Sequence, residues 1–341
     1  MNAPLTNIRV LDLTWNLPGP YATDQLAQLG ADVIKIEPPK GDPARGMPPL
    51  FEALNHRKQC QTLDLQQPED QARLLELVET VDVLVEGFRP GVMDRLGCGP
   101  KVARVRNPRL IYCSISAFGQ TSPQREQPAH DLNIQALTGV CHLNRDARDH
   151  PDGLALPVAD FAAASRAVAF ICAALYARER NDGQGTTLDI AMTEEVGAWS
   201  HVWSLVDLVG ASGDRIPSWA KPLAQPTLRR IARIGLHALP HYGVYRCRDG
   251  RHIALGIVTE GHFWRGLCEA LDLPRFADWS LPARALGSPI LKTVLARTFR
   301  KHTQAEWVAR LAHLPVTAVR TPAEFFSENT AARISDEYST K

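Results

Sequence analysis

A histidine-aspartate pair and a lone aspartate about thirty residues later are the side chains of this sequence best suited to acid–base or nucleophilic chemistry. His130 and Asp131 stand in AHDLNIQALTGV, and Asp160 stands in PVADFAAAS, where a long helix-like run begins. Each also has a structural explanation, because aspartates cap helix starts and a lone histidine is often structural. Free N–H groups at a helix start could instead hold an oxyanion while Asp160 acts as base or nucleophile. Locally, the cap explanation is favoured.

Basic residues follow two expected strands and are candidates for binding phosphates. Arg57 and Lys58 stand in NHRKQ, and Arg89 and Arg95 stand in GFRPGVMDR. In an open parallel sheet, ligands bind beyond the carboxyl ends of the strands. Charge-assisted bonds to phosphate are therefore one explanation, and ordinary solvated charges are the other. Glu260 follows the apolar run IALGIVT and would stand at a helix start, where a carboxylate is favourable anyway.

The bulk composition indicates a globular chain without a strong charge bias. The 341 residues are 45% hydrophobic and 22% charged, and 38 Lys plus Arg against 37 Asp plus Glu give a net charge of +1. Disorder is therefore disfavoured, and no global field would attract nucleic acid or an anionic membrane surface. Seven cysteines without a CxxC pair indicate reduced thiols. The N-terminus lacks a signal-peptide pattern, and the longest apolar tract is too short to span a bilayer. We therefore expect a cytoplasmic protein.

Several familiar cofactor motifs are missing. The sequence has no GxGxxG and no Walker loop, and the first expected strand–helix loop, TWNLPGP, is a poor cradle for a pyrophosphate. No cluster of His, Cys or Asp has metal-ligand spacing. We therefore expect no bound metal and no permanently bound cofactor.

The order of expected elements predicts an α/β fold with two domains. Strand and helix patterns alternate through residues 1–120, as in a doubly wound, Rossmann-like parallel sheet. Residues 161–180 form the strongest helix pattern, and RDG marks a hairpin turn near residue 249. We predict a large domain over residues 1–210, a linker over 211–239 and a small α+β domain over 240–314. Residues 315–341 are a candidate return to the large domain.

Several blocks in order resemble the class III CoA-transferase family (CaiB/BaiF type), which also contains the α-methylacyl-CoA racemases. They are VLDLTWNLPGPYATDQLAQLGADVIKIEPPKGDPAR, LVEGFRPGVMDRLG, NPRLIYCSISAFGQTSP and RNDGQGTTLDIAMTE. The resemblance runs from about residue 7 to 200 and returns more weakly at 241–270. It implies an interlinked homodimer with CoA bound on the large domain, and a CoA thioester as substrate rather than a resident cofactor. The residues expected at the CoA are Leu17, Pro18, Arg57, Lys58, Phe88, Arg89 and Arg95.

The resemblance also assigns roles to the opening residues. Asp160 matches the family's catalytic aspartate, which is a nucleophile in the transferases and one of two bases in the racemases. The pair His130 and Asp131 and the segment VADF resemble the racemase version, and Glu260 matches a glutamate that supports the histidine. Removing a proton α to a thioester and returning it on the other face needs one base on each side. Asp160 and His130 are expected to supply those bases.

Three functions remain open from the sequence. The favoured one is a 2-methylacyl-CoA racemase or epimerase. The second is a CoA-transferase that works through an Asp160 anhydride, and the third is a family member that binds CoA thioesters without turnover. The chain departs from the family at Pro38, where an arginine that contacts CoA is common, at FAAAS after Asp160, where racemases often have glycines, and in its short C-terminal segment.

Overall fold

The structure is a computed structural model that describes residues 3–144, 150–211 and 239–327. The chain divides into two compact units, Met1–Trp203 and Ser204–Lys341. The predicted linker, 211–239, falls almost wholly on residues 212–238, which lie outside the described part of the chain. Each unit has its own sheet and its own hydrophobic core.

The first unit is built on a six-stranded parallel sheet with the order β3-β2-β1-β4-β5-β6. The strands are β1 (Arg9–Leu13), β2 (Asp32–Glu37), β3 (Gln59–Thr62), β4 (Val83–Glu86), β5 (Ile111–Ser116) and β6 (Thr187–Ala191). All neighbouring pairs are parallel. This is the doubly wound order whose direction of winding reverses between β1 and β4. The predicted Rossmann-like α/β class is therefore confirmed.

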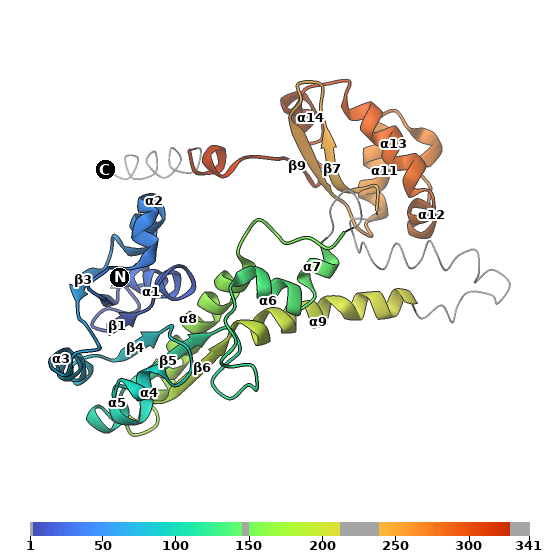
Figure 1. Cartoon of the computed structure of the whole chain (residues 1–341). Coiled ribbons are helices and arrows are strands. Elements are labelled where there is room, and N and C mark those ends of the chain that lie inside the picture. The colour runs from blue at the N-terminus through green and yellow to red at the C-terminus, as the bar shows by residue number, and fades with distance from the viewer. Residues whose placement is uncertain (1–2, 145–149, 212–238, 328–341) are drawn as a thin grey trace. The chain divides into compact units, whose positions relative to one another are not determined.

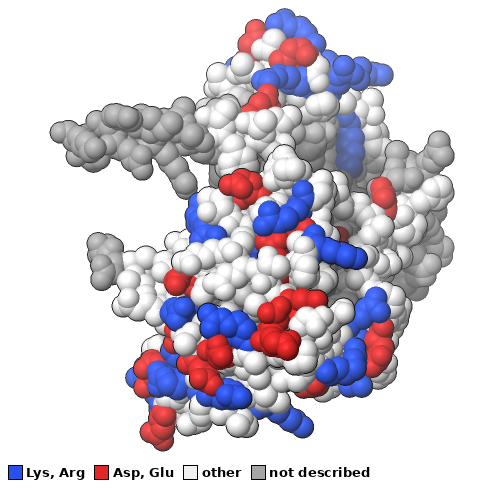
Figure 2. Space-filling model, turned by 60° about the vertical axis from the view of Figure 1, so that its left-hand side comes forward, with Lys and Arg blue, Asp and Glu red and all other residues white. Residues whose placement is uncertain are grey.

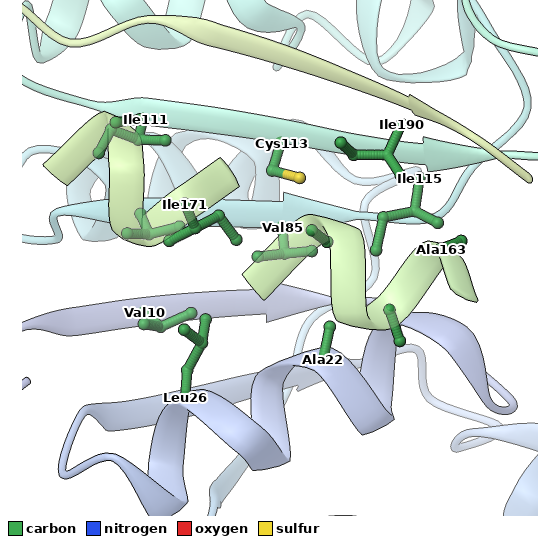
Figure 3. Packing of buried hydrophobic residues seen from close by; sticks show 14 of the residues in the cluster. Val10, Ala22, Leu26, Val85, Ile111, Cys113, Ile115, Ala163, Ile171 and Ile190 are labelled. Carbon is green, nitrogen blue, oxygen red and sulfur yellow. The ribbon is translucent and has the colours of Figure 1, made fainter. Parts of the chain in front are cut away.

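Helices cover both faces of this sheet, as Figure 1 shows. The helices between residues 18 and 211 are α1 (Pro18–Gln28), α2 (Pro48–Asn55), α3 (Pro68–Val78), α4 (Val92–Arg95), α5 (Pro100–Arg106), α6 (Asp131–Leu137), α7 (Val140–Leu143), α8 (Val158–Arg178) and α9 (Met192–Ala211). On one face, α1 and α8 pack over the strands (Figure 3). The other face packs against α3 and α5. Burial on both faces explains why the central strands β4 and β5 are largely apolar and buried, whereas the edge strand β3 (QCQT) is polar and exposed.

The alanine-rich helix α8 is the central helix of the first core. It is long and apolar enough to cross a bilayer by length and composition alone. In the structure it packs instead on β5, β6 and α1. Ala163 and Ala167 are fully buried, and their small side chains let the neighbouring backbones approach closely. Figure 3 shows Ala163 and Ile171 of α8 in the same layer as Ala22 of α1.

The second unit pairs a small antiparallel sheet with helices. The strands run in the order β7 (Tyr242–Arg246), β8 (His252–Gly256) and β9 (Val316–Ala318). The predicted hairpin is confirmed, with Gly250 at φ +81° in its turn. The helices are α11 (Gly261–Ala270), α12 (Leu281–Leu286), α13 (Ser288–Phe299) and α14 (Gln304–Arg310). β9 lies beyond the predicted end of the small domain at residue 314. It pairs with β8 instead of returning to the large sheet.

A buried ion pair fixes the carboxyl end of β1. Lys58 Nζ lies 3.0 Å from Asp12 Oδ2, and neither side chain is exposed to solvent. The same ammonium group donates to Pro20 O, Thr23 Oγ1 and Asn55 Oδ1 at 2.8–2.9 Å. Burial raises the pKa of Asp12, but the charges of Lys58 and Lys35 and the hydrogen bonds from Thr14 and Thr23 together outweigh it and hold that pKa at about 2. Four acceptors on β1, α1 and α2 thus share one cation.

Replacing Lys58 with methionine should therefore destabilise the fold strongly. The change leaves the Asp12 carboxylate buried without its nearest cation, which typically costs about 3–5 kcal/mol. Chemical denaturation should show that loss in the free energy of unfolding. Arg73→Met is the matched control, because Arg73 and Glu76 form an exposed pair and should contribute no more than about 1 kcal/mol. Equal effects of the two substitutions would contradict this account.

Candidate active site

A cavity of about 410 Å³ lies at the carboxyl ends of four strands of the large sheet. Its walls come from the segments that follow β1, β4, β5 and β6, together with residues 125–130 and the start of α8. The cavity thus spans the place where the sheet's winding reverses, which is the usual ligand-binding crevice of this fold. Five of the predicted site residues line it: Pro18, Phe88, Arg89, His130 and Asp160.

The loop between β1 and α1 forms one wall and depends on close packing. A Cβ atom on Gly19 would lie 2.2 Å from Thr14 Cβ, so only glycine fits there. The Thr14 backbone N–H donates to Asp12 Oδ1 at 2.9 Å. The buried ion pair of Asp12 and Lys58 therefore also positions this wall.

Asp131 ties the segment that carries His130 to the helix that carries Asp160. Its Oδ1 accepts the backbone N–H of Ala159 at 2.7 Å and that of Asp160 at 3.4 Å. Its Oδ2 accepts a bond from Gln135 Nε2. Asp131 was expected to cap α6, the helix it begins. Instead it caps the start of α8, and the Asn133 side chain accepts the backbone N–H of His130 at 3.0 Å.

Asp160 is the third residue of α8 and does not act as its cap, because Pro157 occupies the N-cap position. Burial raises the pKa of Asp160 to about 7, and the negative charge of Asp131 adds to this. No hydrogen bond to its carboxylate is found within the described residues. A carboxyl group with a pKa near neutrality, facing a cavity, is suited to giving and taking a proton.

The free N–H groups expected at the start of α8 are already used. Asp131 takes those of Ala159 and Asp160, and Val158 N–H donates to Leu156 O at 2.8 Å. The suggestion that this helix start holds an oxyanion is therefore wrong for this structure. The first turn of α1, with Pro18 and Gly19, is another helix start that lines the cavity.

The remaining predicted residues are not among the described residues that line this cavity. Lys58 is occupied within the buried cluster described above, and Arg57 lies 3.1 Å from Asp24. Leu17 is the N-cap of α1, and Arg95 is exposed at the end of α4. We therefore leave Lys58 out of any phosphate site.

Glu260 belongs to the second unit, whereas His130, Asp131 and Asp160 belong to the first. It is the N-cap of α11, and its Oε2 accepts the Val258 N–H at 2.9 Å. Backbone hydrogen bonds of this kind lower the pKa of its carboxyl group. Glu260 is therefore an anionic residue at a helix start.

A second, more apolar cavity of about 230 Å³ continues the site and was missed from the sequence. It shares Trp15 and Phe88 with the first cavity, and these two rings meet edge-on with centroids 5.5 Å apart. Its other lining residues lie at or just after the ends of β1, β2 and β3 or belong to the segment around α4. They are Leu13, Ile36, Pro38, Leu63, Asp64, Leu65, Gln66, Val92 and Leu96. Apolar residues just after several strand ends are the signal that could have indicated it.

Glu86, at the end of β4, was also missed. Burial raises its pKa to about 7, against the opposing effect of hydrogen bonds from Ser114 and from the Phe88 N–H. The Phe88 N–H lies 2.8 Å from Glu86 Oε2. This carboxyl group therefore positions the loop that carries both Phe88 and Arg89.

The comparisons identify the family. The family model described as "CoA-transferase family III" matches residues 5–335, so the chain belongs to this family. A probable fatty acyl-CoA transferase of Mycobacterium tuberculosis is 32% identical over 96% of this chain and 86% of its own. The human alpha-methylacyl-CoA racemase is 32% identical over 89% of this chain and 74% of its own. A solved CaiB/BaiF family protein from Brucella suis has a TM-score of 0.80 at 27% identity, over 96% of this chain and 86% of that one.

Family membership makes this chain an acyl-CoA enzyme of the class III CoA-transferase family. Relatives with similar identity carry both the transferase and the racemase name. The predicted family and its acyl-CoA chemistry are confirmed.

The raised pKa of Asp160 should make the fold less stable as pH rises. The unfolded chain loses this proton near pH 4 and the folded chain near pH 7, so the folded state binds more protons in between. Stability contributed by the protonated group is therefore lost as pH rises through that window. Asp160→Asn should be more stable than the parent at about pH 8, with a gap that shrinks toward about pH 4.

Denaturant titrations across this pH range measure the gap. Glu86 titrates in the same range in both proteins, so the difference between them isolates Asp160. Glu126→Gln removes an exposed carboxylate and is the control, whose curve should run parallel to that of the parent. Parallel curves for Asp160→Asn as well would show that Asp160 titrates normally.

Proposed function

We propose that this chain is a racemase or epimerase of 2-methylacyl-CoA thioesters that works by two-base proton transfer at C2. The observation that carries the proposal is the pairing of Asp160 and His130 on one cavity. The pKa of Asp160 near 7 suits it to exchange a proton at neutral pH. Asp131 supports the pair by tying the His130 segment to α8.

Racemisation requires two positioned bases and a group that stabilises the negative charge that develops on the substrate. One base takes the α-proton from one face, and the other returns a proton to the opposite face. The thioester oxygen gains negative charge as the proton leaves. The positive end of the α1 dipole, at Pro18 and Gly19, lies on the cavity and favours this charge.

The CoA part of the substrate is assigned to the rest of the groove. Arg89 would pair with phosphate oxygens, and the apolar second cavity would take the adenine ring between apolar side chains. Pro18 and Phe88 line the path between the two ends. Arg57, Arg95 and Leu17 remain predictions that rest on the resemblance. We retain a cytoplasmic, interlinked homodimer as part of the proposal, with Glu260 supporting His130 across the dimer.

A CoA-transferase is the second candidate. It is favoured by the lack of a hydrogen bond to the Asp160 carboxylate within the described residues. A carboxylate that accepts no hydrogen bond within the described residues is available to attack a thioester carbonyl. That attack would release CoA thiolate and leave an acyl anhydride on Asp160. The acceptor carboxylate would displace the first acid from this anhydride, and the CoA thiolate would then attack the new acyl carbonyl, which forms the product thioester and returns the Asp160 carboxylate.

Loss of Arg89 should weaken CoA binding without changing the fold. Removing one charge-assisted phosphate contact costs about 1.5–3 kcal/mol of binding free energy. Titration calorimetry with CoA on Arg89→Ala should show this loss. Arg106→Ala is the control, because Arg106 is exposed on α5 and paired with Glu79. An unchanged CoA affinity in Arg89→Ala would remove Arg89 from the site.

The two chemistries separate when proton exchange and inversion are measured together. In a two-base racemase, His130→Ala should slow interconversion of the 2R and 2S thioesters by about 10²–10⁴-fold. Asp160 can still exchange the proton on its own face, so one epimer should keep taking up deuterium from D2O. Asp160→Ala should give the mirror-image pattern.

A transferase should behave differently in the same assays. Asp160→Ala should abolish turnover, and His130→Ala should show only a modest binding defect. His56→Ala is the control, since His56 is exposed and is not among the residues lining either cavity. Inversion at the parent rate in His130→Ala would contradict the racemase assignment and favour the transferase.

A further inference from the structure

The groove has two distinct ends along the edge of the large sheet. The second cavity lies over the ends of β1, β2 and β3, whereas the first extends from β1 and β4 to β5 and β6. At the β5–β6 end, the lining includes Ile115, Ala117 and Met192 together with His130 and Asp160. On the proposed function, the acyl group therefore lies at the β5–β6 end.

Arg125 lines the first cavity together with His130 and Asp160. It belongs to the segment that follows β5 and stands five residues before His130. Arg89 lines the same cavity and directly follows Phe88, which lines both cavities. The two cations thus reach the cavity from different segments, Arg89 after β4 and Arg125 after β5.

The guanidinium group of Arg125 is only loosely held. Its Nη2 lies 3.6 Å from Oε1 of Glu126, and both side chains are more than half exposed. Its Nη1 lies 3.5 Å from the Gln120 carbonyl oxygen. Both distances are at the outer limit of such contacts, and the structure gives Arg125 no shorter one within the described residues. Most of its donors remain available to a ligand.

Figure 2 shows Lys and Arg interspersed with Asp and Glu on the face that it draws, without one extended basic area. A hydrocarbon chain at the acyl end would strip water from this guanidinium group without replacing its hydrogen bonds, which is unfavourable. A carboxylate would instead accept two parallel N–H bonds from it.

We infer that the acyl group of the substrate carries a carboxylate of its own, and that Arg125 binds it. The substrate class is then the CoA monothioester of a dicarboxylic acid. This inference rests on the proposed acyl-CoA function, and it applies equally to racemisation and to CoA transfer. Arg125 is a specificity-determining residue that contacts the far end of the acyl group and takes no part in proton transfer.

A matched pair of thioesters tests the inference. One is 2-methylglutaryl-CoA with a free carboxylate at C5, and the other is its C5 methyl ester, which has nearly the same shape and no charge. Uptake of α-deuterium and release of CoA to an acceptor acid are measured with both. Calorimetry on the Asp160→Asn variant gives binding without turnover.

The wild-type protein should prefer the free carboxylate in kcat/KM by about tenfold or more, the usual worth of a charge-assisted bond. Arg125→Gln should lower kcat/KM and affinity for the carboxylate by about 10- to 100-fold and change those for the ester by less than about twofold. Arg125→Lys should fall between. Glu126→Gln is the control, because it removes the exposed partner of Arg125 and should leave the preference intact or increase it.

Other outcomes overturn the inference in distinguishable ways. An equal loss on both thioesters in Arg125→Gln would make Arg125 a structural residue. Weaker binding of CoA alone would place Arg125 on the CoA phosphates. If no thioester exchanges deuterium or transfers its acyl group and CoA does not bind, the proposed function fails, and this inference fails with it.

Discussion

The ion pair between Lys58 and Asp12 is the constraint on which the ligand-binding edge of the large sheet depends. A charge without access to water is tolerated only where it is paired and fully hydrogen-bonded. Lys58 meets this requirement by bonding to β1, to α1 and to Asn55 of α2 at once. The geometry of one ammonium group thus holds the start of α1 against the end of β1. The cavity wall formed by Thr14–Gly19 follows from that contact.

A second, weaker constraint works at the other side of the cavity. Asp131 satisfies backbone N–H groups at the start of α8, and that binding keeps its charge within range of Asp160. The same arrangement therefore stabilises the helix and disfavours a second negative charge beside it. A carboxyl group whose ionised form is disfavoured in this way is typical of functional sites, where reactivity is selected at the expense of stability. The tie also explains why a His-Asp pair and a distant aspartate occur together.

Much of the fold could be predicted because it depends on local patterns. The alternation of apolar strands with helical runs indicated the parallel sheet, and the RDG turn indicated the small hairpin. The third strand of the small sheet, Val316–Ala318, could not be found in this way. It is only three residues long and pairs with β8, a strand about sixty residues earlier. Short strands of this kind are specified by tertiary contacts rather than by their own sequence.

The site shows the same division between local and long-range information. His130 and Asp160 were found through the types and order of residues, and both line one cavity. Lys58 was misplaced, because a lysine after a strand looks the same in sequence whether it faces solvent or a buried aspartate. Asp131 was expected to cap its own helix. The neighbouring sequence does not show that the backbone N–H groups at the start of α8 lie within reach of its carboxylate. The second cavity was missed because its lining comes from several separate loops.

The choice between the two proposed chemistries depends on how the thioester is seated. The α-carbon, which a racemase deprotonates, and the carbonyl carbon, which a transferase attacks, are one bond apart, about 1.5 Å. The Asp160 carboxyl group can serve either purpose. With a pKa near 7, it can exchange protons as a base at neutral pH, and part of the population is then the ionised carboxylate that a nucleophile requires. A shift of one bond length is set by the groups that anchor the two ends of the substrate. If Arg89 holds the CoA end and Arg125 the acyl end, these two cations, more than Asp160 itself, decide which carbon faces the carboxylate.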